Sequence, residues 1–236
     1  MLETFALSGT RSLPPARVIR HPAVSRTSRS AQCAAGTEGR SFESRITVRT
    51  GQTVFEEGAS ADYFYKLVAG SVRLVKMVAD GHRQICDFHL PGDLLGFSNR
   101  AEHQFSAEAI EDCVLLRYRR RDLDSLMKND PAFACELQAL TARGLNGAYA
   151  HMVRLCHRSA RDRLAWFLLG MADRSAGEWI HLPMSRVDVA DYLGLAHETV
   201  SRAFTQLKKA GGIVEPTLNR IRIVNRAVLE DGLMAA

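Results

Sequence analysis

Hydrophobic and polar positions alternate in short runs between residues 45 and 120. In SVRLVKMV, valine, leucine and methionine alternate with Arg73 and Lys76, which is typical of a strand buried on one face. Glycine and Pro91-Gly92 turn signals separate the runs ITV, TVF, YFYKLVAG, SVRLVKMV, RQICDFHL and CVLLRY. Short strands with close turns predict an all-β sandwich, roll or barrel over this region.

The period becomes helical after Pro131 and stays so to about Cys156. Heptad spacing places Gln138, Leu145 and Met152 on one row, and Thr141, Ala148 and Leu155 on the other. Gly144 and Gly147 should each cost an isolated helix about 1 kcal/mol, which packing against a partner would offset. We therefore expect two copies to pair through Thr141, Leu145, Ala148, Met152 and Leu155. Burial of this helix within its own chain is the alternative.

Two short helical patterns follow an amphipathic segment at 158–175 and the short strand EWIHLP. They are MSRVDVADYLGL and AHETVSRAFTQLKKAGGI, joined by a tight turn at Gly194. Ser185 with Asp188 predicts a capping box for the first, and Lys208 with Lys209 fits the C-terminal end of the second. NRIRIV then has the pattern of the second strand of a terminal hairpin.

Such a helix pair predicts a helix-turn-helix. Its expected core positions are Val189, Ala190, Leu193, Leu195, Val200 and Leu207. Spacings of three and four residues place His197, Glu198, Ser201 and Arg202 on one stripe of the opposite face. That stripe occupies the N-terminal half of the second helix, where motifs of this kind contact base edges.

The residue types on this stripe suit DNA bases. Arg202 can donate two hydrogen bonds to guanine, and Glu198 can accept one from the cytosine amino group. Ser201 is short, and its hydroxyl can either donate or accept. We expect Ser185, Arg186 and Thr199 to contact backbone phosphates, which fix register without specifying sequence. The simpler alternative is a surface ion pair between Glu198 and Arg202, worth only tenths of a kcal/mol.

Composition limits the other possibilities. The chain has 236 residues, of which 46% are hydrophobic, enough for a core in one large or two modest domains. The net charge of +5 only weakly indicates an anionic partner. No apolar run approaches the ~18 residues needed to cross a bilayer, so we expect no membrane contact. Five scattered cysteines without a C-x-x-C motif favour a reducing cytoplasm.

Residues 1–40 differ from the rest of the chain. Serine and alanine dominate, only Glu3 and Glu38 are acidic, and the basic residues are Arg11, Arg17, Arg20, Arg26, Arg29 and Arg40. We expect a disordered basic arm, because the segment has too little apolar surface to offset its ordering entropy. The same composition could mimic an organelle transit peptide.

From about residue 45 onward the chain resembles the CRP/FNR superfamily of bacterial transcription regulators. GQTVFEEGASADYFYKLVAGSVRL and LPGDLLGF carry the likeness in the β region, and MSRVDVADYLGLAHETVSRAFTQLKKAGGI carries it in the helix pair. The E-x-x-S-R pattern of Glu198, Ser201 and Arg202 is similar to the FNR and FixK branches; the cyclic-AMP branch usually has glycine in place of the serine. The resemblance implies an α+β fold. A cyclic-nucleotide-binding-like β-roll at 41–130 follows the 1–40 arm, with a dimerisation helix at 131–157 and a winged helix-turn-helix at 158–236.

The resemblance also implies a function. A homodimer would bind TTGAT-N4-ATCAA-like palindromes and recruit RNA polymerase, mainly as an activator of microoxic respiration, nitrogen-fixation or denitrification genes. Two departures from the family pattern concern the second helix. His197 stands where an apolar residue or arginine is common, and Ala196 replaces the usual Ser or Thr N-cap at a cost of roughly 1 kcal/mol.

The residues that hold the family's cofactors are missing from this sequence. The nucleotide-binding branch of the family has the motif G-E-L at this point, but here Phe97 follows Gly96 in place of the glutamate. No Arg-Ser pair follows to hold a phosphate. Cys33 is the only cysteine near the N-terminus, too few for an iron–sulfur cluster. Leu94 and Leu95 stand where the haem branch has Cys or His. We therefore expect no cofactor, as in the FixK-like branch.

Two alternatives remain open, and a third is disfavoured by the sequence. A redox- or ligand-gated regulator could use Cys156, whose basic neighbours would lower its thiol pKa, although a plain buried thiol is the simpler interpretation. A second alternative is a cyclic-nucleotide-binding module without a DNA role. The third is a cupin-type enzyme, which needs an H-x-H pair that His82 and His89 do not form. We predict no catalytic or metal-binding residue and no enzymatic activity.

Overall fold

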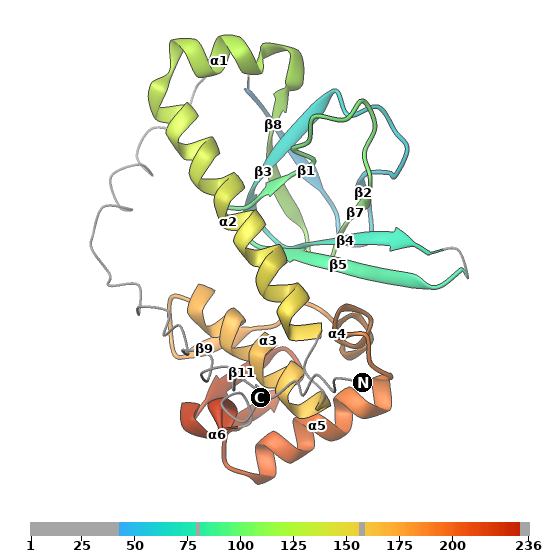
Figure 1. Cartoon of the computed structure of the whole chain (residues 1–236), viewed down its shortest axis with the longest axis vertical. Coiled ribbons are helices and arrows are strands. Elements are labelled where there is room, and N and C mark those ends of the chain that lie inside the picture. The colour runs from blue at the N-terminus through green and yellow to red at the C-terminus, as the bar shows by residue number, and fades with distance from the viewer. Residues whose placement is uncertain (1–42, 79–80, 156–158, 232–236) are drawn as a thin grey trace, which may run out of the picture. The chain divides into compact units, whose positions relative to one another are not determined.

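A computed structural model describes residues 43–78, 81–155 and 159–231 (Figure 1). The predicted basic arm at 1–40 and the candidate redox thiol Cys156 lie outside these ranges. Among the described helices, none has the length and hydropathy to cross a membrane.

The N-terminal part folds into two antiparallel sheets, as the strand pattern predicted. One sheet has the strand order β1-β8-β3-β6 and the other β2-β7-β4-β5. The strands are β1 (Glu43–Val48), β2 (Thr53–Phe55), β3 (Tyr63–Ala69), β4 (Val72–Met77), β5 (Arg83–His89), β6 (Leu94–Leu95), β7 (Ser106–Ala109) and β8 (Cys113–Arg119). Their inward side chains form a core that includes Leu67, Val72 and Leu115, each fully buried.

The turn between β3 and β4 shows why a glycine stands there. Gly70 has φ +86°, a left-handed conformation that side chains with a Cβ rarely adopt. A Cβ at this position would also lie 2.4 Å from the carbonyl oxygen of Asp112. Both the backbone angle and the close approach of the β8 segment therefore require glycine.

A long helix follows the roll in the chain. After a 3-10 turn (Arg120–Asp122) and the short helix α1 (Leu123–Asn129), α2 runs over Pro131–Leu155, close to the predicted 131–157. Phe133 and Leu137 anchor its first turns in a buried cluster with Phe64 and Tyr118. Residues 141–149, in contrast, are all exposed. Residues 141–149 of α2 are therefore little covered by the described part of the chain.

The C-terminal part is a winged helix-turn-helix, in agreement with the predicted fold class. Its elements are α3 (Ala160–Arg174), β9 (Trp179–His181), α4 (Arg186–Leu193), α5 (His197–Lys209), β10 (Ile213–Thr217), β11 (Arg220–Ile223) and α6 (Arg226–Glu230). A three-stranded sheet of order β10-β11-β9 forms the wing. Leu164, Leu168 and Leu193 are fully buried where the helices meet. This packing fixes α4 and α5 against α3.

Candidate nucleic-acid interface

The turn between α4 and α5 follows from one glycine. Gly194 adopts φ 62° and ψ 45°, the left-handed conformation common at helix C-termini. The backbone N–H of Leu195 then donates to the carbonyl of Ala190 at 3.0 Å, which closes the end of α4. The chain can therefore start α5 at His197, after a link of only three residues, Gly194, Leu195 and Ala196.

The two helices begin differently. At α4 the predicted capping box is confirmed: the Ser185 hydroxyl accepts from the Asp188 N–H at 3.0 Å, and the Asp188 carboxylate accepts from the Ser185 N–H at 3.1 Å. At α5 the N-cap is Ala196, which supplies no side-chain hydrogen bond. Packing compensates for this weak start, because Val200, Phe204 and Leu207 are buried against α3 and α4.

The opposite face of α5 is open. His197, Glu198 and Arg202 are exposed, and Ser201 is half-buried. Among the described residues, no ion pair joins Glu198 to Arg202. The Arg202 guanidinium has instead a long 3.4 Å contact with the hydroxyl of Thr199. The four predicted base-contacting residues thus lie on one helix, and the described residues engage few of their polar side-chain groups.

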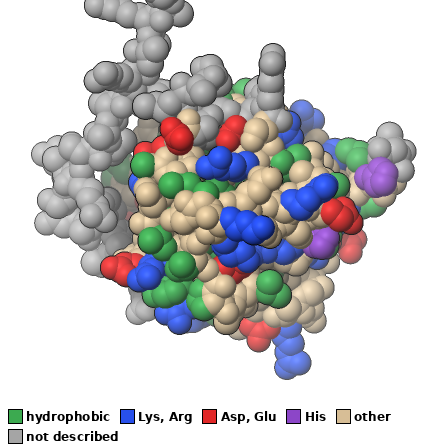
Figure 2. Space-filling model, turned by 90° about the horizontal axis from the view of Figure 1, so that it is seen from below, with side chains coloured by type: hydrophobic (Ala, Val, Ile, Leu, Met, Phe, Trp, Pro, Cys, Tyr) green, Lys and Arg blue, Asp and Glu red, His purple; other side chains and the backbone are tan. Residues whose placement is uncertain are grey.

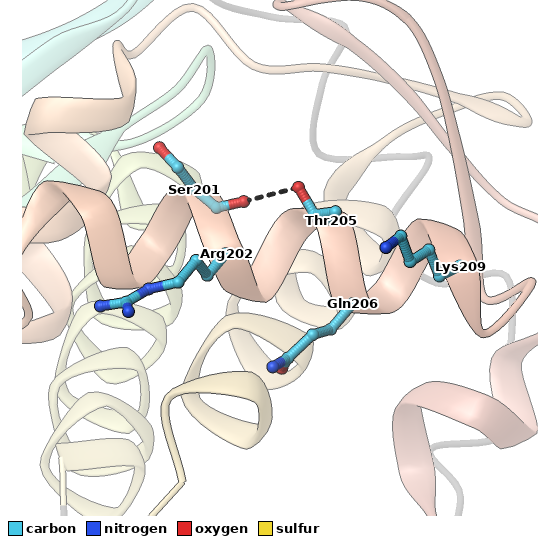
Figure 3. A pocket seen from close by; sticks show the side chains of 5 residues that line it. All are labelled: Ser201, Arg202, Thr205, Gln206 and Lys209. Carbon is cyan, nitrogen blue, oxygen red and sulfur yellow. Dashed lines mark hydrogen bonds between the residues drawn. The ribbon is translucent and has the colours of Figure 1, made fainter.

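The open face continues further along α5 than the sequence analysis placed it. A shallow hollow is lined by Ser201, Arg202, Thr205, Gln206 and Lys209 (Figure 3). Within it the Thr205 hydroxyl donates to the Ser201 carbonyl at 3.0 Å. The prediction covered only the N-terminal half of the helix, where such motifs contact base edges, and so did not include Gln206 and Lys209. Their spacing of four and seven residues from Arg202 was the available signal.

Basic side chains contribute to this side of the molecule. Figure 2 shows Lys and Arg side chains across the middle of the face seen from below, with acidic side chains mainly toward its edge. Arg202 and Lys209 are both exposed on α5. Such a distribution favours a polyanionic partner over a neutral one.

The three predicted phosphate-contacting residues have different surroundings. Thr199 is half-buried on α5 and contacts the Arg202 guanidinium. Ser185 is exposed, but its hydroxyl also bonds the Asp188 carboxylate at 2.9 Å. The Arg186 guanidinium is mostly buried, forms an ion pair with Glu215 of β10, and lies 3.3 Å from the ring centroid of Phe204. Burial lowers the pKa of Arg186 to about 10. Arg186 therefore joins α4, α5 and the wing and does not project from the open face.

The predicted pairing surface on α2 is exposed. Thr141, Leu145, Ala148, Met152 and Leu155 are all exposed, and Tyr149 and Val153 add further uncovered apolar area. A Cβ on Gly144 or Gly147 would meet no atom within 4 Å. Packing inside the described chain therefore does not require either glycine.

Aromatic rings fill the part of the roll around Gly96. The imidazole of His103 is buried and stacks on Phe55 with ring centroids 3.9 Å apart. A Cβ on Gly96 would lie 2.9 Å from this imidazole, and Phe97 packs edge-on against Phe64. These side chains are hydrophobic or weakly polar and offer no guanidinium for a phosphate.

Comparisons with known proteins agree with this geometry. Residues 45–130 match the family model of the cyclic nucleotide-binding domain, and residues 162–231 match that of the Crp-like helix-turn-helix domain. The nitrogen fixation regulation protein FixK of Bradyrhizobium diazoefficiens is 41% identical over 174 residues, which are 72% of this chain and 73% of that protein. The chain belongs to the CRP/FNR superfamily, in its FixK/FNR-like branch.

Other members of the superfamily show the same relationship. FixK of Azorhizobium caulinodans is 39% identical over 182 residues, 75% of this chain and 73% of that protein. The solved structure of FixK2 from Bradyrhizobium japonicum superposes with a TM-score of 0.74 at 38% identity, covering 80% of this chain and 96% of that one. As a FixK/FNR-type member, the chain is a transcription regulator, with the helix-turn-helix as its DNA-binding domain.

Proposed function

We propose that this regulator is a homodimer that binds TTGAT-N4-ATCAA-like palindromes and acts mainly as an activator. One observation carries the proposal: Glu198, Ser201 and Arg202 lie on the uncovered face of the second helix of a helix-turn-helix. That helix is the element that enters the major groove in motifs of this kind.

Each side chain on this face has a proposed role. Arg202 would donate two hydrogen bonds to guanine, and Glu198 would accept from a cytosine amino group. Ser201 would contact a neighbouring base, and His197 would make the outermost base contact. The weak engagement of Arg202 within the protein supports its role, because little has to be broken before it binds DNA.

Backbone phosphates would fix the register of α5. Thr199 is half-buried and can donate to a phosphate oxygen. Ser185 is exposed, but it could donate to a phosphate only by giving up its hydrogen bond to the Asp188 carboxylate. Arg186 could take part only by exchanging its pairing with Glu215. We propose that Gln206 and Lys209, exposed farther along α5, supply additional contacts to the DNA backbone.

Dimerisation would use α2 in the way that the heptad pattern predicts. Two copies joined along Thr141, Leu145, Ala148, Met152 and Leu155 would present two α5 helices related by a two-fold axis. Half-sites would then lie about 34 Å apart, one turn of DNA. The uncovered apolar strip on the second half of α2 supports this arrangement.

The process under control is proposed from the relatives. Proteins named for nitrogen fixation regulation match more than two thirds of the chain, so we propose genes of nitrogen fixation, microoxic respiration or denitrification as targets. The regulator would work in the cytoplasm with RNA polymerase, and without a cofactor. We also propose the division 1–40, 41–130, 131–157 and 158–236 as arm, roll, dimerisation helix and DNA-binding domain.

Substitution of Arg202 tests the proposed base contact. In fluorescence-anisotropy titrations of a labelled operator duplex, Arg202→Ala should lose about 1–3 kcal/mol of binding free energy and relax specificity at one base pair. Arg45→Ala, which removes an exposed arginine from β1 of the roll, is the charge-matched control. Equal affinity and specificity of Arg202→Ala and the control would contradict the proposal.

A second candidate function is a cyclic-nucleotide-binding module without a DNA role, which the family match over residues 45–130 favours. Salt dependence separates the two candidates. Operator binding through phosphates should give a log–log slope of about −0.9 for each phosphate neutralised, because counterions are released. A slope near zero, together with measurable nucleotide binding, would favour the module. A change of operator affinity on adding oxidant or a metabolite would instead identify a gated regulator.

A further inference from the structure

Two arginines of the β4–β5 hairpin reach the first helix of the helix-turn-helix. Arg83 donates from Nη2 to Oδ1 of Asp188 at 2.9 Å and to Oδ2 of Asp191 at 2.8 Å. Arg73 donates from Nη1 to the same Oδ1 of Asp188 at 2.9 Å. The roll and the DNA-binding domain are thus joined by ion pairs that end on α4.

Asp188 is also the third residue of α4 and completes the capping box with the N-cap Ser185. Its Oδ2 accepts from the N–H and the hydroxyl of Ser185, at 3.1 and 2.9 Å, while its Oδ1 accepts from the two arginines. The side chain is only 5% exposed. A buried carboxylate is costly unless its charge is paired. The negative charge of the Asp188 carboxylate, in the first turn of α4, is therefore balanced by arginines of the roll, more than a hundred residues earlier in the chain.

The same hairpin also donates a hydrogen bond to a backbone carbonyl at the C-terminal end of α4. Gln84 donates from Nε2 to the backbone carbonyl of Asp191 at 2.6 Å. This carbonyl is one of the last four of the helix, which have no partner within it. The ring centroids of Phe88 and Tyr192 lie 5.0 Å apart, so apolar packing accompanies the polar contacts. β5 runs next to α4 in Figure 1, in keeping with these contacts.

We propose that Arg73 and Arg83 are positioning residues for DNA binding, which hold α4 in the orientation that presents α5 to the groove. This inference rests on the proposed function. A helix-turn-helix free to rotate against the rest of the chain would lose that freedom on binding DNA, and the loss would weaken affinity. Contacts made before binding remove this cost. The roll thus contributes to operator affinity without binding a ligand or touching DNA.

Arg83 gives the sharper test of the two. Among the described residues, every ion-pair partner of Arg83 lies on α4, whereas Arg73 also bonds Glu108 within the roll at 2.8 Å. Lys76 provides the matched control: it is a cation of the same hairpin, but it pairs with Glu57 of the roll and is 40% exposed. Arg83→Gln and Lys76→Gln remove the same charge from the same hairpin, and only the first breaks contacts with α4.

The measurement is anisotropy titration of full-length protein against a fluorescein-labelled TTGAT-N4-ATCAA duplex and a scrambled duplex. Arg83→Gln should weaken binding to the palindrome roughly fivefold or more. Lys76→Gln should stay within about twofold of wild type, because an exposed pair contributes little. Arg83→Lys, which keeps the charge, should recover part of the loss. Hydrogen exchange of the DNA-free proteins should show faster exchange over residues 186–193 in Arg83→Gln and unchanged exchange in the control.

The outcomes separate this inference from the function on which it rests. Equal weakening by Arg83→Gln and Lys76→Gln would overturn it, since long-range charge alone would then explain the effect. Unchanged or tighter binding by Arg83→Gln, or unchanged exchange of α4, would also overturn it. A wild-type protein with no preference for the palindrome over the scrambled duplex would overturn the proposed function as well. Melting temperatures of all variants show whether any loss comes from unfolding.

Discussion

His103 is the clearest buried titratable group of the roll. It packs against Phe55, and burial lowers its pKa below the ordinary value of 6.5, with a further decrease from the nearby charge of Arg120. The unfolded chain takes up a proton near pH 6.5 that the folded roll resists. This contribution to stability is therefore fully present above about pH 6.5 and is lost as pH falls through 6.5 toward the folded pKa.

Substitution of His103 should change the pH dependence of stability. We expect His103→Gln to flatten the fall in unfolding free energy on acidification from about pH 7 to 5, whatever its effect on absolute stability. Urea unfolding at several pH values measures this slope. His181→Gln, at a histidine that is 60% exposed and bonded to Glu111, is the control. A slope in His103→Gln equal to that of wild type would show that this imidazole does not set the dependence.

Single residues differed in how well their surroundings could be predicted. The capping box of Ser185 and Asp188 was predictable, because its partners are three residues apart and depend only on local backbone. The pairing of Arg186 with Glu215 was not, since it joins a helix to a strand and follows no period. The arginine partners of Asp188 come from another domain, and nothing in the helix-turn-helix sequence points to them.

At the scale of elements, hydrophobic periodicity predicted the helices and strands whose inward residues are large and apolar. The long helix and the hairpin strands β4 and β5 were predicted closely. Strand β7, with the sequence SAEA, was missed because its inward residues Ala107 and Ala109 are too small to give a hydrophobic alternation. Strand β6 has only two residues, and its pairing with β3 depends on tertiary contacts.

The exposed half of α2 gives the prediction that belongs to this scale. Leu145→Glu should weaken dimerisation at least about tenfold, because an unpaired carboxylate at an apolar interface costs more than ~1.4 kcal/mol. Stability of the single chain should change little, since Leu145 is 52% exposed within it. Sedimentation equilibrium of wild type and variant measures the dissociation constant.

Asn146 supplies the control for this substitution. Asn146→Glu introduces the same charge one residue away, outside the two heptad rows, at another exposed position of α2. It should dimerise like wild type. Equal dimerisation of both variants, or a monomeric wild type, would show that these rows are not the pairing surface.

At the scale of the whole molecule, the chain combines a β-roll with a DNA-binding domain whose helix α4 forms ion pairs with the roll. The family matches at 45–130 and 162–231 cover these two parts. The sequence predicted both parts from local patterns. It did not predict their contacts, because partners such as Gln84 and Asp191 are more than a hundred residues apart. The ion pairs between the two parts support the proposal that the roll positions α4 for DNA binding.

Selection of bound sequences from random duplex DNA by the purified, cofactor-free protein tests the central claim most directly. We expect enrichment of a two-fold symmetric site of the TTGAT-N4-ATCAA type, and loss of preference at one symmetric pair of positions when Arg202 is replaced by alanine. Absence of any enriched sequence, or enrichment of a site that Arg202→Ala leaves unaltered, would contradict base recognition by the open face of α5.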